Sequence, residues 1–181
     1  MKKKWFHLLS LIFIAGLFIT LNSCKTTKTG DTHKHSESYR DKKFAEEYSK
    51  KLNIPLSGRE DKKLIKAVAG WIGTPYKYGG ASKTGTDCSG FVMNIYQEVY
   101  NKKLGRSVND IYEKNVRIIK KSELKEGDVV FFKIETKKPG HIGLYIKGNK
   151  FVHASSKRGV TTNSLEEAYY KKYYFASGRV K

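Results

Sequence analysis

The hydrophobic pattern of this chain changes period partway along, and that change restricts the possible folds more than any other feature. Up to about Val116, apolar residues recur at the three-to-four-residue spacing of amphipathic helices. From Val129 onward they fall in short runs separated by turn residues, as in β-strands. Helices followed by antiparallel strands predict a single α+β domain.

The helical half begins with a narrow apolar stripe from Phe44 to Leu52, which should end before Pro55 because proline removes a backbone donor. A second helix is expected with Ser57 as its N-cap, since Glu60 stands three residues later as in a capping box. Its inward side chains are expected to be Leu64, Ile65, Val68 and Trp71.

A glycine-rich segment at residues 73–80 breaks this helix and, with Gly85, predicts a loop. The loop leads to Asp87, a natural N-cap for a helix whose apolar residues follow at helical spacing. Cys88 is therefore expected in the first turn of that helix. A further short helix is expected near residues 109–116.

Four strands are expected in the second half, and the dipeptide Gly148-Asn149 supplies a turn between the second and the third. The expected strands are residues 129–132, 141–146, 150–153 and about 173–180.

The N-terminus carries a targeting segment. Lysines at positions 2–4 precede an apolar run from Leu8 to Leu21, which is the pattern of a signal peptide. At about 14 residues the run is shorter than the roughly 20 that a spanning helix needs, so a permanent transmembrane anchor is the weaker interpretation. Residues 1–23 are therefore expected to be removed on export.

The run ends in Leu21-Asn22-Ser23-Cys24, which resembles the bacterial lipobox, whose Cys becomes the lipidated first residue of the mature protein. The alternative is a chance Cys after an ordinary signal peptide. Lipid on Cys24 would anchor the protein to a membrane of the cell envelope, the outer membrane facing the periplasm in a Gram-negative cell.

A polar segment follows the lipobox. Residues 24–40 are rich in Lys, Thr, Ser and His and lack apolar periodicity, which is typical of a flexible tether. His33 and His35 lie here, but two histidines are too few ligands for a tight metal site. The folded domain is assigned to residues 41–181, with its core at about 60–180.

The number of cysteines leaves one thiol to explain. The chain has two cysteines, so Cys88 has no intramolecular disulfide partner if Cys24 carries lipid. An unpaired thiol in an exported protein is either buried and inert or chemically used.

The formal net charge is +19, and removal of residues 1–23 takes away three lysines and no acid, which leaves +16. Export argues against nucleic acid as a partner and favours anionic wall polymers, lipid headgroups or peptidoglycan carboxylates. A solvated lysine-rich surface explains the charge equally well, because the lysines are spread along the chain.

Cys88 has one of the two features that activate a thiol, because a helix N-terminus favours negative sulfur. The second would be an imidazole. His141 begins a predicted strand, and His153 lies on the neighbouring strand, from which it could orient His141. The alternatives are a buried inert Cys with ordinary strand histidines, or three zinc ligands, one short of a structural site. Residue spacing alone leaves these alternatives open.

The chain contains five motifs that follow one another in this order: Gly73-Thr74-Pro75-Tyr76-Lys77-Tyr78-Gly79-Gly80, Asp87-Cys88-Ser89-Gly90-Phe91-Val92, Leu124-Lys125-Glu126-Gly127-Asp128-Val129-Val130-Phe131-Phe132, Gly140-His141-Ile142-Gly143-Leu144-Tyr145 and Phe151-Val152-His153-Ala154-Ser155. These motifs and their order are similar to those of the NlpC/P60 family of cysteine peptidases. They cover about residues 60–180, and a single domain behind a lipoprotein signal resembles the murein endopeptidases of the Spr type.

The resemblance implies a papain-like fold, with the nucleophile helix packed on an antiparallel sheet, and hydrolysis of amide bonds in peptidoglycan stem peptides. It implies that Cys88 is the nucleophile, His141 the base and His153 the polar third member of a triad.

The resemblance also implies roles for the flanking residues. Tyr78 is expected to help hold the oxyanion beside the Cys88 backbone N–H, while Asp87 and Ser89 shape the substrate subsite. No metal or organic cofactor is required, and we expect a monomer whose partners are peptidoglycan and, through lipid, a membrane.

The resemblance leaves the scissile bond open. The bond between D-glutamate and diaminopimelate, a DD-crosslink, and an amidase or acyltransferase reaction are all compatible with such a fold. The rival outside enzymes is a wall-associated lipoprotein that only binds, and the intact Cys/His/His set argues against it.

Overall fold

A computed structural model describes residues 29–134 and 137–181. The predicted signal peptide, Cys24 and the start of the predicted tether lie outside these residues. The helices are α1 (Thr29–Leu52), α2 (Lys62–Ala69), α3 (Cys88–Tyr100), α4 (Val108–Asp110), a π-helix (Ile111–Asn115), a 3₁₀-helix (Lys121–Glu123) and α5 (Ala168–Tyr173). The strands are β1 (Ala81–Ser82), β2 (Gly85–Thr86), β3 (Val116–Ile119), β4 (Val129–Phe132), β5 (His141–Lys147), β6 (Lys150–Ser155), β7 (Gly159–Ser164) and β8 (Tyr174–Val180).

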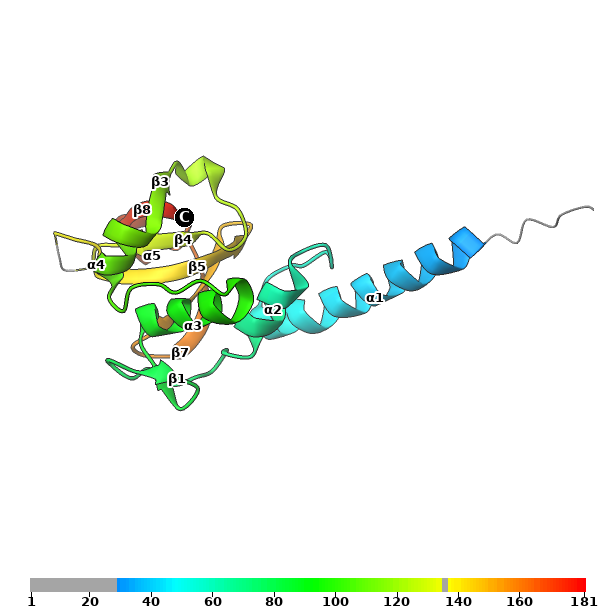
Figure 1. The fold of residues 1–181 in the computed structure, drawn as a ribbon, viewed down its shortest axis with the longest axis horizontal. Coiled ribbons are helices and arrows are strands. Elements are labelled where there is room, and N and C mark those ends of the chain that lie inside the picture. The colour runs from blue at the N-terminus through cyan, green and yellow to red at the C-terminus, as the bar shows by residue number, and fades with distance from the viewer. Residues whose placement is uncertain (1–28, 135–136) are drawn as a thin grey trace, which may run out of the picture.

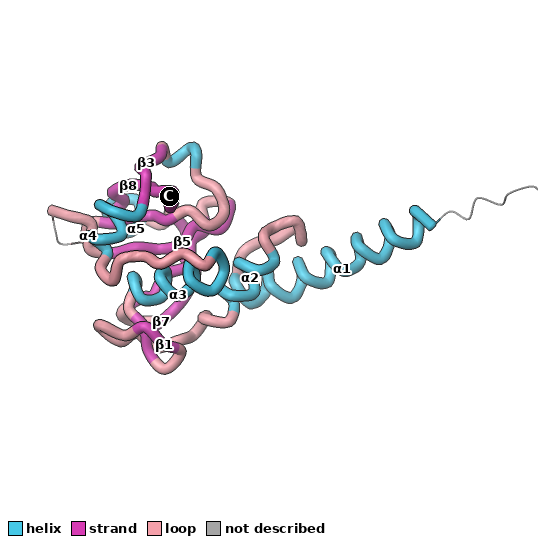
Figure 2. The backbone as a smooth tube through the Cα atoms, in the orientation of Figure 1, coloured by secondary structure: helices cyan, strands magenta, loops and turns pink. Residues whose placement is uncertain are grey.

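The domain is built on one antiparallel sheet. Six strands pair in the order β3-β8-β4-β5-β6-β7, and β1 and β2 form a separate short hairpin. Helices α2 and α3 lie beside the sheet, and long α1 projects from the domain (Figures 1 and 2). The predicted α+β class is therefore confirmed.

The sheet is buried on both faces, as the alternation along β4 shows. Val129 and Phe131 pack into the core that contains α2 and α3, whereas Val130 and Phe132 pack on the other side with Tyr170 of α5. Successive strand residues point to opposite faces, so a run of four apolar residues requires a covering layer on each side. Helix α3 is thereby fixed against β5 and β6.

The hairpin of β5 and β6 confirms the predicted Gly148-Asn149 turn. Both turn residues have positive φ, +56° and +61°, which a tight hairpin turn with the right-handed strand twist requires. The short connection pairs β5 directly with β6. It therefore brings His141 on β5 close to His153 on β6.

Helix α1 departs from the sequence expectation. The residues before about Ser38 were expected to lack regular structure, but α1 begins at Thr29. Its C-terminal part is packed, since Phe44 and Leu52 are buried. Once this part is helical, each further residue adds one hydrogen bond without a new nucleation cost, so the helix can extend into the polar residues that precede it.

The start of α2 is also corrected. Ser57 and Glu60 do hydrogen-bond as a capping pair would, with the Ser57 N–H donating to Glu60 Oε1 at 3.0 Å. The helix nevertheless begins at Lys62, and Asp61 is its N-cap because its carboxylate accepts from the backbone of Lys63 and Leu64. The Ser57–Glu60 pattern therefore marks a turn that precedes the helix, and not the N-cap of the helix.

None of the helices in the described part of the chain is long and apolar enough to cross a membrane.

Candidate active site

The Cys88 thiol lies at the first residue of α3, in the position predicted from the sequence. Asp87 is the N-cap, with extended backbone at φ −92° and ψ 179°, and its side chain accepts from the Gly90 N–H at 2.7 Å. Cys88 is a free cysteine and only 7% exposed. Its sulfur also lies within hydrogen-bonding reach of the Ile142 backbone N–H on β5, one residue from His141.

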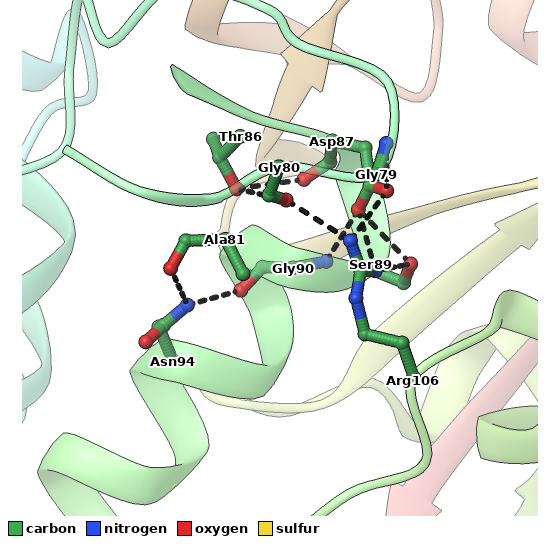
Figure 3. Close-up of polar contacts among 9 residues, drawn as sticks. All are labelled: Gly79, Gly80, Ala81, Thr86, Asp87, Ser89, Gly90, Asn94 and Arg106. Atoms are coloured by element: carbon green, nitrogen blue, oxygen red, sulfur yellow. Dashed lines mark hydrogen bonds and ion pairs between the residues drawn. The ribbon is translucent and has the colours of Figure 1, made fainter. Parts of the chain in front are cut away.

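Asp87 is the centre of a polar cluster around the start of α3 (Figure 3). Its carboxylate accepts from the Gly79 N–H at 3.0 Å and the Ser89 hydroxyl at 3.1 Å. Arg106 donates to both carboxylate oxygens, at 3.0 and 2.8 Å, and also to the Ser89 oxygen at 3.0 Å. Burial raises the pKa of Asp87, but the hydrogen bonds from Arg106 and Gly90 outweigh it and hold this pKa below its usual range.

The loop that precedes Cys88 is held tightly against α3. A Cβ on Gly90 would come 2.3 Å from the Gly80 carbonyl oxygen, so only glycine permits this approach. The Asn94 amide adds a second link, because it donates to the Ala81 carbonyl at 3.0 Å and the Gly90 carbonyl at 2.8 Å (Figure 3). Asp87, Cys88 and Ser89 are thus positioned by a rigid loop and helix start.

Two tyrosines lie in this loop, and they occupy different environments. Tyr78 follows Lys77 in a tight turn closed by the Gly80 N–H donating to the Lys77 carbonyl, with Gly79 at φ +71°. This turn leaves Tyr78 90% exposed. Tyr76 is partly buried and its pKa is raised by burial and then by the nearby Cys88. The structure therefore favours Tyr76 over the predicted Tyr78 as the tyrosine beside the thiol.

His141 and His153 are brought together as the sequence predicted. His141 Nε2 and His153 Nδ1 are 2.8 Å apart. His153 is only 2% exposed, and its Nε2 lies 3.0 Å from Asn163 Oδ1 on β7 and 3.1 Å from the Tyr170 hydroxyl. A buried chain of polar groups therefore runs back from His141 through the sheet.

The hydrogen-bond partners of Asn163 determine where the protons lie in this series of polar groups. The Asn163 amide nitrogen donates to Glu167 Oε2 at 2.6 Å, and Arg158 donates to Asn163 Oδ1 at 2.8 Å. Oδ1 is therefore an acceptor and takes the His153 Nε2–H. His153 Nδ1 must then accept from His141 Nε2–H, which leaves His141 Nδ1 with a free lone pair.

Two clefts open on either side of Tyr76 and Gly140, which line both. The nucleophile cleft has a volume of about 470 Å³, and the histidine cleft about 520 Å³. Around the nucleophile cleft are Tyr78, Asp87, Cys88, Ser89 and Arg106, and around the histidine cleft are His141, His153, Lys157, Arg158, Tyr169 and Tyr170.

Burial keeps the reactive groups neutral at rest. It raises the pKa of Cys88 to about 11, even though the backbone N–H groups of Ile142, Ser89 and Cys88 pull it down. It lowers the pKa of His141 to about 3 and that of His153 to about 4. The sequence expectation of a lowered thiol pKa at the helix start is therefore wrong for the resting protein, because desolvation outweighs the helix dipole.

Because of the two buried histidines, we predict that the folded protein loses stability in mild acid. An unfolded His binds a proton near its ordinary pKa of 6.5, whereas folded His153 binds one only near 4. Protonation between these values stabilises the unfolded chain alone, so stability present above pH 6.5 is lost as pH falls. At pH 5, His153 alone should lower the free energy of unfolding by about 2 kcal/mol.

Denaturant unfolding at pH 7 and pH 5 measures this loss. Asp87 and Glu60 remain ionised at pH 5, because both have lowered pKa values, so they contribute little to this loss. His153→Asn should show a smaller fall than the wild type. An equal fall in both proteins would show that His153 is not its source.

Several residues at the site had no role in the sequence analysis. Tyr76 lies in the first motif, but the oxyanion role was assigned to its neighbour Tyr78. Arg106 and Asn163 carry no local signal, because their partners lie on other elements of the fold. Glu167 did have one, since Ser164 and Glu167 stand three residues apart before α5 and the Ser164 N–H donates to Glu167 Oε1 at 2.7 Å. Within residues 29–134 and 137–181, no group of three or more His, Cys, Asp or Glu side chains could hold a metal ion.

Comparison with known proteins identifies the family of this chain. The family model of the NlpC/P60 family matches residues 73–179. A "Probable endopeptidase NlpC homolog" of Haemophilus influenzae is 43% identical over 120 residues, covering 66% of this chain and 63% of that protein. The "Murein DD-endopeptidase MepS/Murein LD-carboxypeptidase" of Escherichia coli K12 is 38% identical over 128 residues, covering 71% and 65%.

A solved structure gives the same result for the fold. A crystal structure described as similar to lipoprotein, NLP/P60 family, from Staphylococcus aureus superposes with a TM-score of 0.59 at 28% identity, covering 66% of this chain and 40% of that one. The match thus spans just under two thirds of the length of the two sequence relatives and 40% of the solved chain. The model match, the sequence relatives and the fold agree, and the chain belongs to the NlpC/P60 family.

Proposed function

We propose that this protein is a cell-wall cysteine peptidase that hydrolyses amide bonds of peptidoglycan stem peptides. One observation carries the proposal: a buried free thiol at the start of α3 faces the strand of His141, and His141 is hydrogen-bonded to His153 at 2.8 Å. The names of the relatives, which include endopeptidases acting on murein, support the substrate class.

In the proposed reaction Cys88 is the nucleophile and His141 the base. Because His141 Nε2–H is committed to His153, Nδ1 is the atom that takes the thiol proton. The thiolate attacks the amide carbonyl, and the resulting imidazolium protonates the leaving amine, which leaves the acyl half as a thioester on Cys88. Water, deprotonated by His141, then attacks the thioester, releases the carboxylic acid half and restores the Cys88 thiol. Since both groups are neutral at rest, the proton moves when substrate binds and attack begins, rather than beforehand.

His153 is proposed as the orienting third member. Its neutral ring accepts the His141 Nε2–H and fixes the His141 tautomer, and Asn163 and Glu167 fix the His153 ring in turn. Burial supports this role, because a 2% exposed His153 cannot easily adopt another orientation.

The oxyanion is proposed to bind the Cys88 backbone N–H together with the Tyr76 hydroxyl. Tyr76 lines both clefts, whereas Tyr78 is exposed at the rim of the nucleophile cleft. Asp87 and Ser89 support the cleft wall, and their hydrogen bonds within the chain make positioning their main contribution.

The test is identification of the products from purified peptidoglycan. The wild type should release fragments with one new amino group and one new carboxyl group per cut within the stem peptides, as read by mass spectrometry after muramidase digestion. Cys88→Ala is the matched control. Whole stem peptides freed from glycan would indicate an amidase, joined peptides an acyltransferase, and binding without products a non-catalytic role.

We further propose that Cys24 is lipidated and anchors the protein in the cell envelope, since it directly follows the apolar run. Cys24→Ala should release the protein from the membrane fraction or leave an unprocessed precursor there. Fractionation with fatty-acid labelling measures this, and Cys88→Ala serves as control because it removes the other cysteine. Unchanged mature lipoprotein in the Cys24 variant would contradict the anchor.

A further inference from the structure

The histidine cleft has a different charge from the nucleophile cleft. In the nucleophile cleft, Arg106 is neutralised by its ion pair with Asp87 at 2.8 Å. The histidine cleft contains the side chains of Lys157 and Arg158, and none of the described residues that line it is acidic. Its two histidines are neutral at pH 7 because burial lowers their pKa values. Among the described residues that line it, the charged side chains are therefore Lys157 and Arg158.

Neither of these cations forms an ion pair within the described part of the chain. Both are exposed, in the turn between β6 and β7. Arg158 is held in place by the neutral Asn163 amide at 2.8 Å, which uses one of its five N–H donors. Glu167 is engaged elsewhere, with the Asn163 amide nitrogen and the Ser164 backbone. The guanidinium is thus oriented with no described carboxylate in ion-pair contact with it.

The position of this cleft relative to the chemistry suggests its ligand. His141 forms part of its wall and, in the proposed function on which this inference rests, donates a proton to the departing amine. The leaving fragment must therefore lie on the His141 side. An ammonium and a planar guanidinium recognise carboxylates through charge-assisted hydrogen bonds.

We propose that the histidine cleft is the leaving-group subsite and that Lys157 and Arg158 select amine fragments that carry a free carboxylate. This chemistry separates the possible scissile bonds. A residue released from the middle of a linear stem peptide continues through its own carbonyl. A diaminopimelate released at a crosslink, or a residue released at the peptide end, carries a free carboxylate next to the departing amine. The cleft thus favours crosslinks and terminal residues.

Two synthetic muropeptides test the subsite, identical except that the residue supplying the amine carries either a free carboxylate or a carboxamide. The full-length wild type, purified in detergent, should cleave the carboxylate substrate with about tenfold higher kcat/KM, as expected for interaction with two partly exposed cations. Lys157→Glu should remove most of this preference through KM and leave kcat/KM for the carboxamide within about twofold. Lys103→Glu makes the same charge change at an exposed lysine that lines neither cleft, and should retain the wild-type preference.

Arg158→Gln separates substrate binding from the positioning of Asn163. A binding role lowers kcat/KM mainly for the carboxylate substrate, whereas a purely positioning role lowers it equally for both substrates. Two results would overturn the subsite but leave the peptidase activity intact. One is equal cleavage of both substrates by the wild type, and the other is that the Lys157 and Arg158 variants lose the same amount of kcat/KM for the carboxylate and the carboxamide substrate. Cleavage of neither substrate would overturn the proposed function as well.

Discussion

Cys88→Ala folds normally and loses at least about a thousandfold in hydrolysis of peptidoglycan, because the nucleophile is removed and the remaining groups act only as a unit with it. Cys88→Ser is nearly as inactive. Its hydroxyl holds its proton more tightly than a thiol, and burial already opposes charge at this position. Release of new amino groups from soluble muropeptides measures the rate, and circular dichroism checks the fold.

Two inhibitors provide the control for the Cys88 variants. A thiol alkylator should abolish wild-type activity, and a chelator should leave it unchanged. Inactivation by the chelator but not by the alkylator would instead support the zinc alternative for Cys88, His141 and His153. Turnover by Cys88→Ala at a rate close to the wild type would eliminate the thiol mechanism.

The histidine pair should give a graded response. His141→Ala is expected to be nearly as inactive as Cys88→Ala, since it removes the proton carrier. His153→Ala should lose about a hundredfold, because His141 Nε2–H is left without its acceptor and its tautomer is no longer fixed. His153→Asn should recover more activity than His153→Gln, since the Asn oxygen takes the place of Nδ1, the atom that contacts His141.

Turnover of muropeptides by the three His153 variants measures this order, and the unfolding transition of each variant shows whether its fold is retained. If His153 had only a structural role, the variants would lose stability, and His153→Asn would not recover more activity than the other two. Wild-type rates in all three variants would remove His153 from the site and leave a dyad of Cys88 and His141.

The parts of the fold that the sequence predicted correctly are those determined locally. Asp87 as N-cap, the α3 stripe and the Gly148-Asn149 turn depend on residues within a few positions of one another, so their patterns are visible in the sequence. Strand β3 was missed because it has only four residues and directly follows a helical segment, and β7 was missed because it is mainly polar. Their pairing with β8 and β6 is set by tertiary contacts. The length of α1 was missed for a related reason, since tertiary packing of its C-terminal part stabilises the helix and allows it to extend toward Thr29.

The candidate site was predictable in its residues and less so in its electrostatics. Cys88, His141 and His153 came from motif and strand position, and the structure brings the two histidines to 2.8 Å. The direction of the Cys88 pKa was predicted wrongly, because a helix start is a local feature and burial is a property of the whole fold. Choosing Tyr76 over Tyr78 also required the three-dimensional turn.

In the proposed mechanism, Cys88 forms a covalent bond to the carbonyl half of a stem peptide. The most direct measurement is to quench wild-type protein with acid during turnover of a muropeptide and to map the mass of its peptides. The peptide containing Cys88 should gain the mass of the acyl half, and the corresponding peptide of Cys88→Ala should gain none. Products that accumulate while the acyl mass sits on another residue, or on none, would contradict it.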